Sequence, residues 1–293
     1  TWLQFNAQLL RLTGEARFAD ELEKTVLNQL FGAQCPDGSG WGYYVQMQGK
    51  KPYSSVLDGH CCLSSGPRGV ALIPSFALTT DADGVVVNLY DSETAKLTLR
   101  DGTPVTITTE TQYPSDGRIR FKIKANTSCA VKLRIPSWCE NARVLVDGKD
   151  TPLKRGTDGY VAVQRDWKKT GQIELNLKLE PRLITGDHKN EGRLAVMYGP
   201  LVLTADEALL EKDDPPLKVV GAAAADLHSL DITEEDAPKK SKTWRGAKVF
   251  RMNAVVRKPA DDKKIGETFP IRLVPFADAG ANSNNYKIWL PYT

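Results

Sequence analysis

The chain has 293 residues, of which 39 are basic and 36 acidic, with a formal net charge of +3 and 41% hydrophobic side chains. Its Lys and Arg residues are scattered, so they offer no electrostatic footprint for nucleic acid, and no apolar run approaches the roughly 20 residues of a membrane span. The five cysteines are too few for a disulfide scaffold, and their odd number leaves at least one thiol free or metal-bound. A soluble protein is expected. Its compartment, whether cytoplasmic, periplasmic or secreted, and its oligomeric state stay open.

The first 35 residues predict a helical hairpin. Gly14 marks the end of the first helix, and the second is expected over residues 15–31. The apolar faces consist of Trp2, Phe5, Leu9 and Leu12 in the first helix and of Phe18, Leu22, Val26 and Leu30 in the second. The opening residues show neither a secretory signal pattern nor a helix cap or lead-in, which predicts that the chain is cut from something longer.

A breaker cluster, CPDGSGWG at residues 35–42, ends the helical part. Residues 43–58 are expected to be irregular and rich in aromatic side chains, and residues 68–74 to form a short helix. From about residue 75 the apolar period changes to two, which predicts strands separated by Gly, Asp and Pro turns. They are expected at residues 85–90, 95–100, 105–111, 118–125 and 130–136, and the pattern continues to about residue 180.

Further strand patterns lie beyond residue 180, at residues 193–205 and in the last part of the chain. The polar stretch between them, residues 206–242, is expected to be a loop with some helix. Short strands at regular spacing favour an antiparallel β-sandwich. We therefore divide the chain into a helical part (residues 1–75), a β-sandwich (76–185) and a second β-rich domain (186–293).

The stretch LDGHCCLSSGPRG, residues 57–69, places Cys61 and Cys62 side by side after His60. Adjacent cysteines pair poorly with each other, because the ring that their disulfide closes forces the peptide out of its normal geometry. They can instead pair elsewhere, bind a metal, stay as inert buried thiols, or supply a thiolate. The residues alone do not decide among these roles.

Other chemically interesting side chains have simpler interpretations. His60 is typical of a hydrogen-bonded loop residue, although it could serve as a third ligand or a base, and His188 and His228 are expected to be exposed. Cys129 and Cys139 are expected to be packing residues, and Cys35 the odd, exposed thiol. Trp138 and Trp167 could form a sugar-stacking platform, but core or edge packing is the commoner role of a tryptophan at a strand end.

Several phrases resemble glycoside hydrolase family 127, whose type activity is β-L-arabinofuranosidase. The helical hairpin LLRLTGEARFADELEKTVLNQLFGAQ and the strand phrases TQYPSDGRIRFKI, LRIPSWCENARVLVDG, GYVAVQRDW, LAVMYGPLVLTADEA and LVPFADAGANSNNYKIWLP follow the order found in that family. The resemblance implies the last helices of an (α/α)6 barrel in residues 1–75, followed by antiparallel β-sandwich domains. Most of the barrel would then lie upstream of Thr1.

The resemblance also implies a zinc site and a cysteine nucleophile. Cys61 would be nucleophile and zinc ligand, Cys62 a zinc ligand, and Tyr44 an active-site tyrosine, with Tyr43 as the competing choice. The other two ligands would come from a Glu-x-Cys element, which this chain lacks, and the general acid would also lie outside it. A Cys3Glu set suits tetrahedral zinc, and two thiols alone cannot complete it, so this chain is expected to bind zinc weakly or not at all.

Two functions follow. The first is the C-terminal part of a zinc-dependent, retaining glycoside hydrolase, inactive as this fragment, acting on a plant-type glycan or an arabinose-containing oligosaccharide. The alternative is a non-catalytic β-sandwich module that binds carbohydrate or a protein partner. No nucleic-acid or membrane partner is expected in either case.

Overall fold

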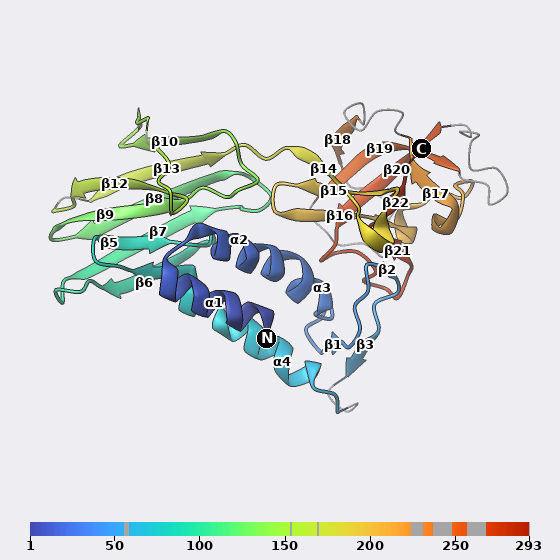
Figure 1. Cartoon of the computed structure of the whole chain (residues 1–293), viewed down its shortest axis with the longest axis horizontal. Coiled ribbons are helices and arrows are strands. Elements are labelled where there is room, and N and C mark those ends of the chain that lie inside the picture. Colours follow the sequence, from blue (N-terminus) through green and yellow to red (C-terminus); the bar gives the residue numbers. More distant parts are fainter. Residues whose placement is uncertain are drawn as a thin grey trace. The chain divides into compact units, whose positions relative to one another are not determined.

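The computed structural model describes residues 1–55, 59–152, 154–168, 170–223, 231–236, 248–256 and 268–292. The chain divides into two compact units (Figure 1). Unit 1 comprises Thr1–Val26 and Arg68–Leu179, and unit 2 comprises Leu27–Pro67 and Glu180–Thr293. None of the described helices is long and apolar enough to cross a membrane.

Helix α1 (Trp2–Thr13) ends as predicted at Gly14, whose φ of 69° lets its N–H bond back to the Leu10 carbonyl. Helix α2 (Ala16–Lys24) continues through a π-helical segment, η1 (Thr25–Leu30), into α3 (Phe31–Ala33). The predicted second helix is therefore confirmed. Its π-helical segment was not predicted, and such a segment shifts which side chains share a face.

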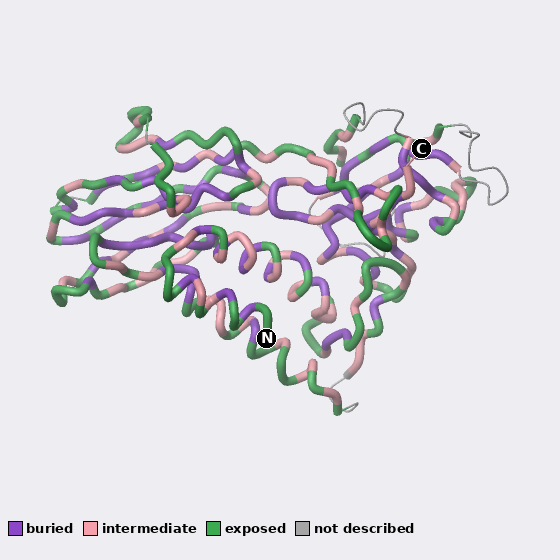
Figure 2. The backbone as a smooth tube through the Cα atoms, viewed as in Figure 1, coloured by how far each residue is buried: buried purple, intermediate pink, exposed green. Residues whose placement is uncertain are grey.

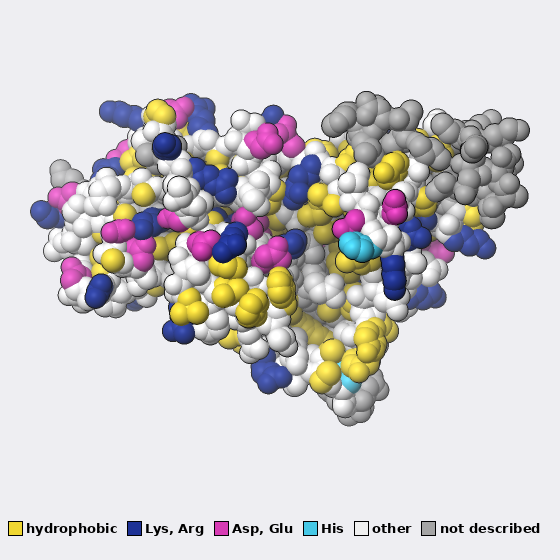
Figure 3. Space-filling view, viewed as in Figure 1, with side chains coloured by type: hydrophobic (Ala, Val, Ile, Leu, Met, Phe, Trp, Pro, Cys, Tyr) yellow, Lys and Arg dark blue, Asp and Glu magenta, His cyan; other side chains and the backbone are white. Residues whose placement is uncertain are grey.

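The apolar face expected on α1 is largely exposed. Trp2, Phe5 and Leu12 are 54%, 52% and 73% exposed, whereas Leu3 and Leu10 are buried. Hydrophobic side chains gather on the surface over α1 (Figure 3). The periodicity correctly predicted a helix. Periodicity alone does not show which side of a helix is covered by neighbouring elements. In the described residues, the covered side of α1 is the side that carries Leu3 and Leu10.

Unit 1 contains two sheets. One has the order β11-β10-β13-β8-β7-β6 and the other the order β12-β9-β5-β4. Their strands are β4 (Leu78–Thr80), β5 (Gly84–Val87), β6 (Glu93–Thr98), β7 (Pro104–Thr111), β8 (Arg118–Ala125), β9 (Ser128–Arg134), β10 (Ala142–Val146), β11 (Lys149–Asp150), β12 (Tyr160–Asp166) and β13 (Gly171–Leu177). The pairing is antiparallel except between β5 and β9. A mostly antiparallel β architecture is thus confirmed, while the (α/α)6 barrel remains a prediction.

Strand β8 shows how the sequence pattern becomes a core. Ile119, Phe121 and Ile123 are at most 1% exposed, and the basic residues between them are exposed (Figure 2). Period-two alternation gives one buried and one solvated sheet face. The basic residues of this strand therefore belong to a wet face, as predicted, and not to a nucleic-acid surface.

Unit 2 is built on a sheet with the order β14-β15-β16-β20-β19-β17. Its strands are β14 (Pro181–Thr185), β15 (Arg193–Tyr198), β16 (Leu201–Asp206), β17 (Val220–Ala222), β18 (Ile232–Glu235), β19 (Val249–Val256), β20 (Thr268–Pro275), β21 (Tyr286–Lys287) and β22 (Leu290–Pro291). The strand-like stretch expected over residues 193–205 consists of two strands, β15 and β16. The chain turns at Gly199 and Pro200, so β15 and β16 pair as a hairpin.

The polar stretch 206–242 holds two short 3-10 helices, η4 (Glu207–Leu209) and η5 (Leu217–Val219), together with β17 and β18. Parts of the stretch lie outside the described residues. The same sheet also receives the two-residue strand β2 (Gln48–Gly49), which pairs with β21, whereas β1 (Gly40–Gly42) and β3 (Tyr53–Ser55) pair with each other. Of residues 43–58, which were expected to be irregular, residues 48–49 and 53–55 are thus ordered by strand pairing.

Candidate functional site around the cysteine pair

The cysteine pair lies at the beginning of helix α4 (Cys62–Leu72). The helix predicted over residues 68–74 therefore begins earlier, at Cys62, and a separate helix, α5 (Pro74–Ala77), follows it. The Cys61 carbonyl accepts hydrogen bonds from the Ser64 and Ser65 N–H groups. These bonds form the first turn, and the helix continues through Gly66 and Pro67.

Both thiols of the pair are free, so a disulfide to another cysteine is not observed. Cys61 is exposed and Cys62 is half-buried. The Cys62 Sγ lies 3.8 Å from the Tyr43 carbonyl oxygen, to which it donates a weak hydrogen bond. Burial, followed by the neighbouring Cys61, raises the pKa of the Cys62 thiol. The pair alone therefore does not favour a thiolate at position 62 at neutral pH.

Tyr43, rather than Tyr44, lies against the residues next to the pair. Its ring is 5.1 Å from that of His60, while Tyr44 makes an edge-to-face contact with Tyr43 at 4.6 Å. Tyr44 is 69% exposed and Tyr43 48%. The nearby Tyr44 and Cys61 groups raise the pKa of the Tyr43 hydroxyl. The structure thus brings Cys61, Cys62, Tyr43 and His60 together and connects Tyr44 to them through Tyr43. The catalytic assignment of Tyr44 stays a prediction.

Several polar side-chain atoms in residues 41–60 are buried without a hydrogen-bond partner. They are both ring nitrogens of His60, the Trp41 indole nitrogen and the Tyr53 hydroxyl. Trp41 is 3% exposed and packs so tightly on Gly66 that a Cβ there would lie 1.8 Å from its Nε1. Unpaired buried donors and acceptors are costly. Ligand groups that can both donate and accept hydrogen bonds would satisfy them. Nothing in the sequence pattern indicated Trp41 or Tyr53.

The donor set fits a metal only in part. Two thiols are side by side, but no group of three or more His, Cys, Asp or Glu side chains in the described parts of the chain could hold a metal ion. Tetrahedral zinc needs four ligands, so Cys61 and Cys62 would supply half of such a site.

The structure also describes most of the remaining candidates. Cys129 and Cys139 are buried in unit 1, as expected, while Cys35 is half-buried rather than exposed. Trp167 is fully buried and donates to the Cys129 carbonyl at 2.9 Å, so it cannot stack on a sugar. Trp138 is half-buried, with its Nε1 3.1 Å from Glu23 Oε2. His188 is exposed, and His228 lies outside the described residues.

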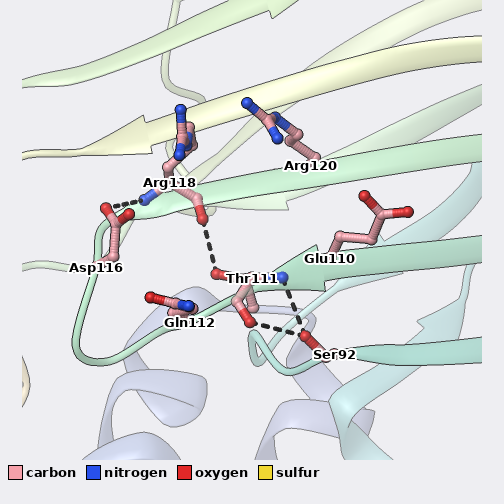
Figure 4. Close-up of a pocket in the computed structure, with 7 residues that line it drawn as sticks. All are labelled: Ser92, Glu110, Thr111, Gln112, Asp116, Arg118 and Arg120. Carbon is pink, nitrogen blue, oxygen red and sulfur yellow. Dashed lines mark hydrogen bonds between the residues drawn. The ribbon is translucent and has the colours of Figure 1, made fainter. Parts of the chain in front are cut away.

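Unit 1 carries a separate polar groove of about 370 Å³ (Figure 4). It is lined by Ser92, Glu110, Thr111, Gln112, Asp116, Arg118 and Arg120. Thr111 joins its walls, because its Oγ1 donates to the Arg118 carbonyl and its N–H donates to Ser92 Oγ. The lining carries both negative carboxylates and positive guanidinium groups. Because neither sign of charge dominates, the groove favours a neutral ligand that is rich in hydrogen-bonding groups over an ion.

Two family models match the chain. Residues 1–75 match the β-L-arabinofuranosidase GH127 catalytic domain, and residues 84–179 match the β-L-arabinofuranosidase GH127 middle domain. Together they cover more than half of the chain. The chain belongs to glycoside hydrolase family 127. The cysteine pair falls within the catalytic-domain match of this family, and the polar groove within the middle-domain match.

Relatives from family 127 agree with this assignment. The non-reducing end β-L-arabinofuranosidase of Bifidobacterium longum subsp. longum is 23% identical over 310 aligned residues, which cover 93% of this chain and 45% of that protein. Among solved structures, a GH127 β-L-arabinofuranosidase from Geobacillus stearothermophilus T6 has a TM-score of 0.85 at 19% identity, covering all of this chain and 49% of that one. The GH127 β-arabinofuranosidase BT3674 has a TM-score of 0.84 at 24% identity, with 100% and 48% covered. The chain thus spans about half the length of these relatives.

Proposed function

We propose that this chain is the C-terminal part of a zinc-dependent, retaining glycoside hydrolase of family 127, and that Cys61 is its nucleophile. The observation that carries the proposal is the cysteine pair at the start of α4, within the stretch that matches the family's catalytic domain. Cys61 is the exposed member of the pair, so a substrate can reach it, whereas Cys62 is half-buried.

The chemistry follows from the two thiols. In a first step the Cys61 sulfur forms a bond to the anomeric carbon while the bond to the leaving oxygen breaks, and a general acid outside this chain gives that oxygen a proton. In a second step water attacks the anomeric carbon, loses a proton to the same group, and frees the cysteine. Two displacements at one carbon retain its configuration.

Zinc would be held by Cys61 and Cys62 together with a Glu and a Cys from a Glu-x-Cys element outside this chain, and when bound it would supply the thiolate form of the nucleophile. Burial raises the pKa of the Cys62 thiol, so this ligand would also need the metal to become a thiolate. Alone, this chain provides two ligands and no general acid. We therefore infer that it binds zinc weakly or not at all and does not hydrolyse glycosides.

The substrate class is inferred to be an arabinose-containing oligosaccharide or plant-type glycan, because the relatives are named as β-L-arabinofuranosidases or β-arabinofuranosidases. The unpartnered ring nitrogens of His60 and the indole of Trp41 support a ligand rich in hydroxyl groups. Hydroxyls both donate and accept, so they can satisfy an imidazole and an indole N–H at once.

The experiment compares this chain with the longer protein that supplies the remaining catalytic-domain residues. Zinc content and hydrolysis of an aryl β-L-arabinofuranoside are measured for both, each with Cys61→Ser and with Cys35→Ser as a matched control at another thiol. We expect stoichiometric zinc and activity in the longer protein only, both reduced by Cys61→Ser and neither by Cys35→Ser. Full activity of the longer Cys61→Ser protein would contradict the proposal.

A second candidate function, carbohydrate binding by the sandwich, is favoured by the polar groove rather than by tryptophans. Trp167 is excluded as a platform by its burial. If the groove binds sugar, arabinose-containing oligosaccharides should perturb the amides of residues 111–120 in NMR titrations, and Arg118→Ala should abolish the effect. Lys96→Ala, on the neighbouring strand β6 outside the groove lining, should leave it unchanged.

A further inference from the structure

Lys51 is a lysine buried to 2% exposure in the segment between the helices and the cysteine pair. Its Nζ donates to the Phe276 carbonyl at 2.7 Å and to the Ala277 carbonyl at 3.2 Å. The same ammonium lies 4.7 Å from the centre of the Phe276 ring and 5.8 Å from that of Tyr286. All of these partners belong to the β-rich part of unit 2, far from Lys51 in sequence.

Removing the Lys51 ammonium from water costs free energy, and nearby acidic side chains offset part of that cost. Asp206 and Asp278 are close enough to act electrostatically on the ammonium, in the direction that favours its charged form. Burial nevertheless lowers the pKa of Lys51 to about 8. A methionine of similar length would fill the space between the two rings, so packing alone does not require a lysine. The specific gain is a pair of charge-assisted hydrogen bonds to carbonyls just after strand β20.

The residues before Lys51 are attached to the same part of unit 2. Strand β2 pairs with β21 through Gln48↔Lys287 and Gly49↔Tyr286. Beyond the strand, the Tyr286 hydroxyl donates to the Gln46 carbonyl at 2.5 Å, and the Ile288 N–H donates to the Met47 carbonyl at 3.0 Å. Residues 46–51, which we name the anchored segment, are therefore held against the sheet by strand β2 and by the contacts on either side of it, with Lys51 at the C-terminal end.

The anchored segment leads directly into the candidate site. Three residues before it, Tyr43 contacts the His60 ring and accepts the hydrogen bond from Cys62 Sγ. Val45 packs against the hydrophobic cluster that contains Phe276. The position of Tyr43 relative to the cysteine pair thus depends on where residues 45–51 are held.

We propose that Lys51 is a positioning residue, which fixes the anchored segment on the β-rich part of unit 2 and so keeps Tyr43 against His60 and Cys62. This inference rests on the proposed function, because positioning Tyr43 matters for catalysis only if the cysteine pair is the active site. It assigns the C-terminal strands a role in holding that site in place. The placement itself can be measured without any glycosidase activity. Failure of the proposed function would therefore be distinguishable from failure of this inference.

The test uses this chain and a small thiol reagent, with the labelling rate of each cysteine read from peptide masses at pH 7. In Lys51→Met, the Cys62 labelling rate should rise about tenfold, because loss of charged hydrogen bonds makes local opening more frequent. Tyr286→Phe, which removes only the bond to Gln46, should raise it less. Lys50→Met, at the exposed neighbouring lysine, is the matched control and should leave it unchanged.

The other cysteines separate positioning from general destabilisation. Cys61 is exposed and should label quickly in every variant, while Cys129 and Cys139 are buried in unit 1 and should stay protected. A rise at Cys62 alone supports the proposal. An unchanged Cys62 rate in Lys51→Met overturns it, and so does an equal rise at Cys129 and Cys139, since Lys51 would then stabilise the fold at large rather than the site.

Discussion

Arg134 and Glu23 form an ion pair inside unit 1, at 0% and 3% side-chain exposure. The same guanidinium bonds to Asp20, a second acid on helix α2. Glu23 also accepts from the Tyr113 hydroxyl at 2.6 Å, and the Ser137 N–H donates to Asp20 Oδ2 at 3.1 Å. Helix α2 is therefore fixed to the sheets of unit 1 by a hydrogen-bonded and largely buried charge cluster.

Removing the guanidinium should be costly. Arg134→Met leaves two carboxylates buried without their cation, and we expect unfolding free energy to fall by about 3 to 5 kcal/mol. Urea unfolding followed by tryptophan fluorescence measures this. Arg143→Met, at an exposed ion pair with Asp150, should cost less than about 1 kcal/mol. If the two variants lose the same unfolding free energy, the buried cluster stabilises the fold no more than an exposed ion pair does.

Gly66 is predicted to be required for the packing of Trp41. In Gly66→Ala the new methyl would lie 1.8 Å from the indole nitrogen, so either the ring or the first turn of α4 must move, at a cost of about 1 to 3 kcal/mol. A shift in tryptophan emission and a lower urea midpoint should report it. The neighbouring Pro67→Ala lies in the same helix without this clash and should not destabilise. A wild-type midpoint for Gly66→Ala would contradict the close contact.

Lys51 should make stability depend on alkaline pH. Because its pKa falls from 10.5 to about 8 in the folded state, the unfolded chain binds more protons between these values, and the contribution of Lys51 to stability rises with pH. The wild type should gain about 2 to 3 kcal/mol relative to Lys51→Met between pH 7 and pH 10.

Asp206, Asp278 and Tyr286 face Lys51 and remain in both proteins, so their own titration largely cancels in the comparison. Lys50→Met is the control, and its stability should follow the wild-type curve. Urea unfolding at a series of pH values measures the difference. If the difference in unfolding free energy between wild type and Lys51→Met stays constant or shrinks as the pH rises, burial does not lower the pKa of Lys51.

The sequence predicted the elements that depend on local pattern. Strand β8 was expected over residues 118–125 and lies there, because strict alternation puts Ile119, Phe121 and Ile123 on one face. Helix α1 ends at Gly14 as expected. The helix expected over residues 68–74 begins earlier, at Cys62, where the bonds to the Cys61 carbonyl form its first turn.

The sequence could not predict features that depend on distant pairing. Arg134 and Glu23 are 111 positions apart, and an arginine at a strand end looks like any surface arginine. Lys51 stands beside another lysine and before a proline, a pattern typical of an exposed loop. The cysteine pair was recognised because adjacent thiols are unusual and because the surrounding phrases resemble family 127. The contact of Tyr43 with His60 and Cys62 required the structure.

The most direct test of the central claim is to trap the covalent intermediate in the longer protein. An activated arabinofuranosyl substrate whose second step is slow is mixed with the enzyme, and the labelled peptide is identified by mass. We expect one pentosyl group on Cys61 and none on Cys62, and no label in Cys61→Ser. A label on a carboxylate or on Cys62, or turnover with retained configuration in Cys61→Ser, would contradict the assignment of Cys61 as the nucleophile.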